Sequence, residues 1–183
     1  LLPSPSWVSY GPQAEILNKA VEWVDTVETD WRLTPKALDE HCRNTSSKPR
    51  LMVLNYPNNP TGLSYDADTL AAIATVCRRH GIIVISDEIY GLVNHSGDHR
   101  SIGEFYPEGS IICSGLSKWC GAGGWRLGYA CVPRNLNPLM GALATVASET
   151  FTSVSAPIQY SAITAFEDHT DTHRYLADSR RLL

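Results

Sequence analysis

The sequence predicts an α/β fold, a doubly wound and mainly parallel sheet with helices on both faces. Short apolar runs alternate along the chain with stretches of helical periodicity, which is the pattern of βαβ units and a parallel sheet. The apolar runs, such as Ile82–Ile85, are continuous, as in strands that are covered on both faces. The 183 residues and the 43% hydrophobic fraction are enough to build the core of one domain.

The first half of the chain contains predicted strands and helices in alternation. The strands are Leu1–Tyr10, Trp23–Val27, Leu51–Leu54 and Ile82–Ile85. The helices are Pro12–Lys19, Pro35–Arg43 and Asp66–Arg79. Thr34 and Pro35 form a helix start, in which an N-cap threonine precedes a proline at the first helical position. The third helix has the clearest pattern, because its apolar residues recur at spacings of three and four and Gly81 suits its C-terminal cap.

The second half continues the pattern after a predicted loop at residues 93–108. Strands are predicted for Ser110–Cys113 and Leu127–Val132. Helices are predicted for Asn137–Ala147, Ala156–Glu167 and Thr172–Leu183.

The composition argues against several classes of partner. The net charge is −4 and no long basic run occurs, so we expect no nucleic-acid or membrane partner. No apolar run approaches the roughly 20 residues that span a bilayer. The five cysteines show no C-x-x-C spacing and the histidines no ligand spacing, so we expect no metal site. Reduced thiols and the lack of a signal peptide predict a cytoplasmic protein, or an organellar one if an import segment has been removed.

Polar residues with chemical potential follow the predicted strands. Asn59, Asp87 and Lys118 each come after an apolar run, and Arg126 precedes the last one. In parallel sheets, ligands bind outside the carboxyl ends of the strands, so we expect these side chains to share one site. A lysine at the mouth of a buried strand is expected to be desolvated, which makes it a better nucleophile. Our first hypothesis is therefore that Lys118 forms a Schiff base and that Arg126 binds an anion.

This combination of side chains matches the needs of pyridoxal 5'-phosphate. The cofactor needs a lysine for covalent attachment, a carboxylate beside the pyridine nitrogen and donors to the phenolate oxygen. It also needs an arginine for the phosphate and an aromatic ring for stacking. The chain supplies these groups, in that order, as Lys118, Asp87, Asn59 with Tyr90, Arg126 and Trp7.

Several motifs resemble, in order, those of the class I/II aminotransferases, which are fold-type-I pyridoxal phosphate enzymes. The motifs are Pro5–Tyr10, Asn58–Gly62, Ser86–Tyr90, and Ser117–Lys118 followed by Gly124–Tyr129. The resemblance implies that Lys118 carries the cofactor and shuttles a proton. It implies catalytic roles for Asp87 and Tyr90 as well, with Tyr10 as a supporting contact of Asp87. It further implies amino acid and 2-oxo acid substrates, a homodimer in the full-length protein, and an antiparallel last strand.

One position departs from the family pattern. Many members have a serine three residues before the lysine, in contact with phosphate, where this chain has Gly115. Ser114 or Ser117 is expected to take that place. The same glycine argues against a serine hydrolase with an S-x-x-K motif.

The resemblance also implies that residues 1–183 are the central part of the large cofactor-binding domain. An N-terminal segment and a C-terminal small domain, which bind phosphate and the substrate carboxylate in the family, are expected to be absent. We therefore expect little turnover from the chain alone, and we expect residues 127–132 to form an exposed sheet edge.

Other interpretations stay open at this point. Taken alone, Asp87 could be a helix N-cap, Asn-Pro-Thr-Gly a plain turn and Lys118 a solvated surface residue. Two alternative enzymes share the expected chemistry: a related pyridoxal phosphate lyase and a 1-aminocyclopropane-carboxylate synthase. A third alternative is the non-catalytic, effector-binding domain of a regulator. The sequence does not identify the amino acid substrate.

Overall fold

The computed structural model describes residues 1–45 and 50–182, and it confirms the α/β class. The central sheet has the order β3-β4-β5-β6, with β3 at Arg50–Asn55, β4 at Ile82–Asp87, β5 at Ser110–Gly115 and β6 at Gly128–Cys131. The first two pairings are parallel, and β6 runs antiparallel to β5, as the family resemblance implied.

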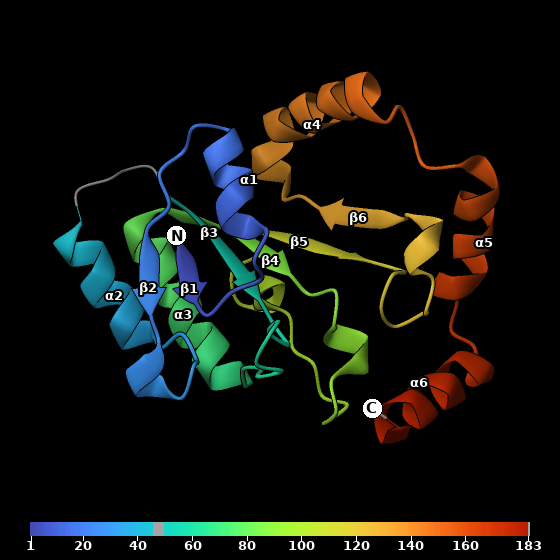
Figure 1. Cartoon of the computed structure of the whole chain (residues 1–183), viewed down its shortest axis with the longest axis horizontal. Helices are drawn as coiled ribbons and strands as arrows, with labels where there is room; N and C mark the ends of the chain where they lie inside the picture. The colour runs from blue at the N-terminus through green and yellow to red at the C-terminus, as the bar shows by residue number, and fades with distance from the viewer. Residues whose placement is uncertain (46–49, 183) are drawn as a thin grey trace.

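Two short strands form a separate small sheet beside β3. Strands β1 (Leu2–Ser4) and β2 (Trp23–Asp25) form a parallel pair. The Val53 amide donates to the Leu1 carbonyl at 3.1 Å, so β1 lies beside β3. Figure 1 shows β1 and β2 on one side of β3, with β4, β5 and β6 following on the other.

The helices lie close to their predicted positions. They are α1 (Tyr10–Ile16), α2 (Pro35–Asn44), α3 (Ala67–His80), α4 (Asn137–Thr150), α5 (Ala156–Phe166) and α6 (Thr170–Leu182). The caps of α2 and α3 form as predicted: the Thr34 hydroxyl accepts from the Ala37 amide at 3.1 Å, and Gly81 ends α3 in the left-handed region at φ 62°. The predicted end of the last helix, Leu183, lies outside the described residues.

Two sequence predictions near the N-terminus are wrong. The first strand ends at Ser4 and does not continue to Tyr10, because Pro5 has no amide hydrogen for a strand ladder and the chain turns into α1. Helix α1 begins at Tyr10 and ends at Ile16, so it does not reach Lys19. The predicted loop at 93–108 also contains a short 3₁₀ turn, η3 (Ile102–Glu104), and follows η2 (Gly91–Val93).

The main core lies between the sheet and helices α2 and α3. It contains Met52, Leu54 and Val84 from the strands and Leu70 and Ile73 from α3, all buried. Successive strand side chains point to opposite faces, and in β4 burial alternates accordingly. The second face, which carries Ile85, is half-buried and looks toward α1 and a cleft. The two faces are therefore covered unequally.

A second apolar cluster holds the loop after β5. Leu116, Trp119 and Ala122 pack against Ala162 of α5 and Leu176 of α6. This packing connects the loop that carries Lys118 to the last two helices. Figure 1 shows α5 and α6 beyond the end of β5, on the opposite side of the sheet from α2.

The predicted exposed edge is confirmed. All four residues of β6 are exposed, and within the described residues its sheet partner is β5 alone.

Three further findings concern the cysteines, possible metal ligands and membrane-spanning helices. The five cysteines are free thiols. No group of three or more His, Cys, Asp or Glu side chains among residues 1–45 and 50–182 is arranged to hold a metal ion. None of the helices described is both long and apolar enough to cross a membrane.

Candidate active site

A cleft of about 600 Å³ lies at the carboxyl ends of the central strands. The structure brings all eight residues singled out from the sequence to its walls: Trp7, Asn59, Asp87, Tyr90, Ser114, Ser117, Lys118 and Arg126. A cleft of this size is typical of small-molecule sites. The eight residues therefore lie together at the carboxyl ends of the strands, as expected. The chemical role of each residue stays a prediction.

Asp87 stands at the centre of the cleft because β4 ends there. Its backbone pairs with Asn55 of β3 on one side and Cys113 of β5 on the other. Its Oδ2 accepts a hydrogen bond from the Tyr10 hydroxyl at 2.6 Å, and its Oδ1 accepts from the Ile89 amide at 3.2 Å. Burial, and then the hydrogen bond to Asp87, raise the pKa of Tyr10 well above its usual value. Tyr10 therefore remains a donor to this carboxylate at physiological pH.

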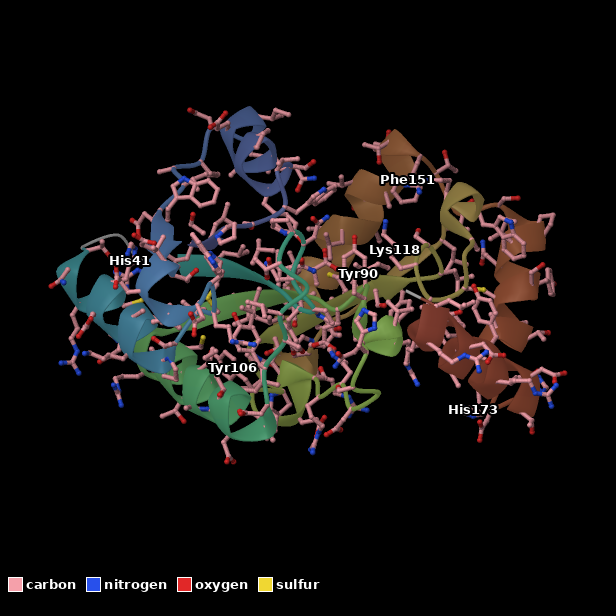
Figure 2. The ribbon with its side chains drawn as sticks, turned by 60° about the horizontal axis from the view of Figure 1, so that its bottom comes forward. His41, Tyr90, Tyr106, Lys118, Phe151 and His173 are labelled. Carbon is pink, nitrogen blue, oxygen red and sulfur yellow. The ribbon has the colours of Figure 1, made fainter. Side chains whose placement is uncertain are left out.

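Lys118 and Tyr90 face each other across the cleft. The Lys118 Nζ atom lies 5.5 Å from the centre of the Tyr90 ring, and Figure 2 shows the two labelled side chains near the middle of the molecule. Within the described residues Nζ has no hydrogen-bond or ion-pair partner. The predicted desolvation of Lys118 is wrong for this chain, because its side chain is exposed.

The Asn55–Asn59 turn forms another wall. The Asn55 side chain donates to the Asp87 carbonyl at 3.0 Å and accepts from the Asn59 amide at 2.8 Å. Asn55 therefore connects the Asn59 turn to the end of β4. Sequence reasoning placed Asn55 with Asn58 and Asn59 at the end of an apolar strand, where a shared site was expected, but gave it no role; the structure places it on the cleft wall.

The opposite wall offers groups suited to an anion. Ser114 and Ser117 line the cleft, and their hydroxyls make no hydrogen bond within the described part of the chain. Arg126 is exposed, with a left-handed backbone at φ 57°, and its Nη1 donates to the Gly123 carbonyl at 2.8 Å. Arg126 also borders a second hollow of about 640 Å³ that is lined by Phe151 and Ser155.

The structure explains the glycine at position 115. A Cβ atom there would lie 2.5 Å from the Leu127 carbonyl oxygen and 2.9 Å from the Gly128 Cα atom. The antiparallel pairing of β5 with β6 brings the two backbones together at this point. A serine side chain does not fit without separating the strands, so only Ser114 and Ser117 can supply hydroxyls from this segment.

Two more residues complete the cleft. The Trp7 ring packs edge-on against Tyr10, with ring centres 5.3 Å apart. Cys113 lies beside Asp87, and burial together with the negative charge of Asp87 raises the pKa of its thiol to about 11. Cys113 was missed by sequence reasoning, because a cysteine within an apolar strand has the pattern of a core residue.

The arrangement corresponds to a known family. The family model described as aminotransferase class I and II matches residues 1–183. The chain belongs to this family. An aspartate aminotransferase of Geobacillus stearothermophilus is 34% identical over 171 residues, which are 91% of this chain and 42% of that protein. An aspartate/prephenate aminotransferase of Thermus thermophilus is 31% identical over 178 residues, 97% of this chain and 45% of that protein.

Solved structures of aminotransferases share the fold. The aspartate aminotransferase from Thermus thermophilus with maleate superimposes with a TM-score of 0.88 at 30% identity, covering 98% of this chain and 46% of that one. The aromatic aminotransferase from Pyrococcus horikoshii gives a TM-score of 0.85 at 29% identity, covering 98% and 48%. The chain thus spans about half the length of the relatives it matches.

Proposed function

We propose that the chain forms the cofactor-binding part of a pyridoxal phosphate-dependent aminotransferase, with Lys118 as the attachment point. The observation that carries the proposal is the meeting of an unpaired lysine amine, a carboxylate and an anion-binding wall around one cleft. Family membership adds independent support. The substrates proposed are an amino acid and a 2-oxo acid.

The residues present fit the cofactor. The Asp87 carboxylate is fixed by the Tyr10 hydroxyl and the Ile89 amide, so it can face a protonated ring nitrogen without rearranging. Ser114 and Ser117 have hydroxyls free to donate to a phosphate group. The Arg126 guanidinium uses one donor on Gly123 and keeps the others for an anion.

Pyridoxal phosphate, when bound, supplies an electron-withdrawing ring that accepts the electron pair released from the substrate α-carbon. In this chain, Asp87 would hold a proton at the ring nitrogen, which keeps that withdrawal strong. The Tyr10 hydroxyl orients the carboxylate for this task. Trp7 would stack on the ring from the α1 side of the cleft.

Lys118 has the second task. Its amine would attach the cofactor covalently and, as a free amine, would act as the base that accepts the proton from the substrate α-carbon at Nζ. Tyr90 and Asn59 would donate hydrogen bonds to the phenolate oxygen. Arg126, Ser114 and Ser117 would hold the phosphate and so fix the ring relative to Lys118.

The substrate is proposed from the relatives. Several of them are named aspartate aminotransferases, so aspartate is the first amino donor to test. The lyase alternative uses the same lysine, and product analysis separates it: transamination yields a 2-oxo acid together with an aminated partner, and elimination does not. The homodimer and the cytoplasmic location expected from the sequence remain proposals.

The central test is labelling. The protein is mixed with pyridoxal phosphate, its absorbance is recorded, and borohydride is added to fix the cofactor covalently. We expect the label on Lys118 and its loss in Lys118→Ala, whereas Lys36→Ala should keep it, because Lys36 is an exposed residue of α2 paired with Glu40. A label on another lysine, or none, would contradict the proposal.

A further inference from the structure

Consecutive residues at the end of β4 point to opposite faces of the sheet. Asp87 lines the cleft, whereas Glu88 is buried on the core side, 8% exposed. The end of β3 repeats this arrangement: Asn55 lines the cleft and Tyr56 is fully buried. The Tyr56 hydroxyl donates to the Glu88 carboxylate at 3.0 Å. Beneath the proposed cofactor site there is thus a second polar layer, which the proposed chemistry does not use.

Four side chains bind the buried carboxylate. Its Oε1 accepts from the hydroxyls of Tyr56, Ser86 and Ser101 at 3.0, 2.9 and 2.8 Å. Its Oε2 lies 2.9 Å from the His99 Nε2 atom. Burial opposes the charged form, but the hydrogen bonds from His99, Ser101 and Ser86 outweigh it and hold the pKa of Glu88 below its usual value. We call these five residues the Glu88 cluster.

His99 is held tightly in this cluster. Its ring lies over the Tyr56 ring, with centres 5.3 Å apart and planes 31° apart. Gly91 also approaches it closely: a Cβ atom there would lie 2.7 Å from the His99 Cδ2 atom. Because an ionised carboxylate only accepts hydrogen bonds, Nε2 must carry the proton toward Glu88. The Nδ1 atom is buried without a partner among the described residues.

The Glu88 cluster is connected to the cleft through one short turn. The Gly91 amide donates to the Glu88 carbonyl at 2.9 Å, and the Glu88 amide donates to the Cys113 carbonyl at 2.9 Å. Asp87 precedes Glu88, and Tyr90 lies two residues after it. Asp87 and Tyr90 flank Glu88 in the sequence, so a shift of Glu88 would move both of these cleft side chains.

We propose that His99 and Glu88 are positioning residues that fix the orientation of Asp87 and Tyr90 toward the cofactor. The inference rests on the proposed function, because it assumes that the cofactor binds between these side chains. His99 clamps Glu88 from the 99–102 segment, and Glu88 in turn fixes the 87–91 turn. Neither residue touches the cleft.

A loosened turn has a spectroscopic consequence. Asp87 would keep a positive charge at the ring nitrogen of the bound cofactor, and Tyr90 would donate to its phenolate oxygen. Both contacts would lower the proton affinity of the nitrogen through which Lys118 holds the cofactor. Removing His99 should therefore weaken cofactor binding and raise the pH midpoint of the absorbance change of the bound cofactor.

The test compares three variants with the wild type. His99→Leu removes the clamp, His99→Gln keeps a side-chain N–H that can reach Glu88, and His95→Leu is the control, an exposed histidine of the same loop. We expect His99→Leu to bind the cofactor about ten-fold more weakly, equivalent to about 1.4 kcal/mol, and to raise the midpoint by about half a pH unit. His99→Gln should recover most of both effects, and His95→Leu should match the wild type.

A merely structural role predicts a different result. In that case His99→Leu lowers the unfolding temperature of the cofactor-free protein but leaves cofactor affinity and the pH midpoint unchanged, and the inference is wrong. If His99→Leu does not fold, Ser86→Ala removes one hydroxyl from Glu88 and must show the same two shifts in smaller measure, or the inference fails. Wild-type protein without label on Lys118 would overturn the proposed function first, in a separate measurement.

Discussion

The hydrogen bond between Tyr10 and Asp87 can be tested without the cofactor. Tyr10→Phe removes the hydroxyl that donates to Oδ2 at 2.6 Å and keeps the ring that packs against Trp7. Hydrogen bonds to charged groups contribute about 1.5–3 kcal/mol. Both partners are only half-buried, so water replaces part of the lost contact, and we expect the unfolding free energy to fall by about 1–2 kcal/mol.

Urea unfolding at neutral pH measures this change, with an unchanged m-value as evidence that the denatured state is unaffected. Tyr160→Phe is the matched control, because Tyr160 is 75% exposed. A double-mutant cycle with Asp87→Ala isolates the pair, and Tyr10→Phe should have little effect once Asp87 is gone. A coupling energy below about 0.3 kcal/mol would refute the reasoning, because independent sites add to within that margin.

Two further predictions concern the strands around the site. Gly115→Ser should destabilise the protein by about 1–3 kcal/mol, as overpacking does, because its Cβ atom would approach the Leu127 carbonyl oxygen. Gly124→Ser is the control, because nothing lies within 4 Å of a Cβ atom at that position. Equal unfolding free energies of the two variants would contradict the explanation. The pKa of Glu88 is lowered in the folded protein. The ionised carboxylate therefore stabilises the fold above the pKa of about 4.3 that a glutamate has in the unfolded chain. The protein loses this stabilisation as the pH falls through the pKa of Glu88 in the folded state. The gap in unfolding free energy between wild type and Glu88→Gln should therefore be constant near neutral pH and narrow in acid, and urea titrations that find it widening there would disprove the assignment.

Much of the architecture could be predicted from local signals. Continuous apolar runs identified β3, β4 and β5, because strands in a parallel sheet are apolar along their whole length. The caps of α2 and α3 followed from single residues, Thr34 and Gly81, whose side-chain or backbone properties act within one turn. The residues that follow such strands meet at the carboxyl-terminal end of the sheet. This is why the predicted site residues all reach the same cleft.

The predictions that were wrong or missing depend on contacts between residues that are distant in the sequence. Residues 5–9 have strand-like composition, yet they leave the sheet because Pro5 stops the ladder and Tyr10 reaches Asp87 from the start of α1. The exposure of Lys118 depends on what covers the cleft, which no local pattern records. Asn55 was expected near the site but was given no role, because its contacts are with the neighbouring strand and the following turn. The Glu88 cluster was missed because it joins residues 45 positions apart in the chain, from Tyr56 to Ser101.

The exposed strand β6 leaves a row of backbone groups at the lateral edge of the sheet. Its outer row of amide and carbonyl groups lacks partners within the described residues, and such a row pairs with any extended peptide whatever its side chains. Most substitutions in β6 should therefore leave the tendency to associate unchanged. A proline, which removes a donor, or a lysine, whose charge repels a second copy, would block it. Any pairing at this edge would then depend on a few peptide groups rather than on the exposed aromatic residues nearby.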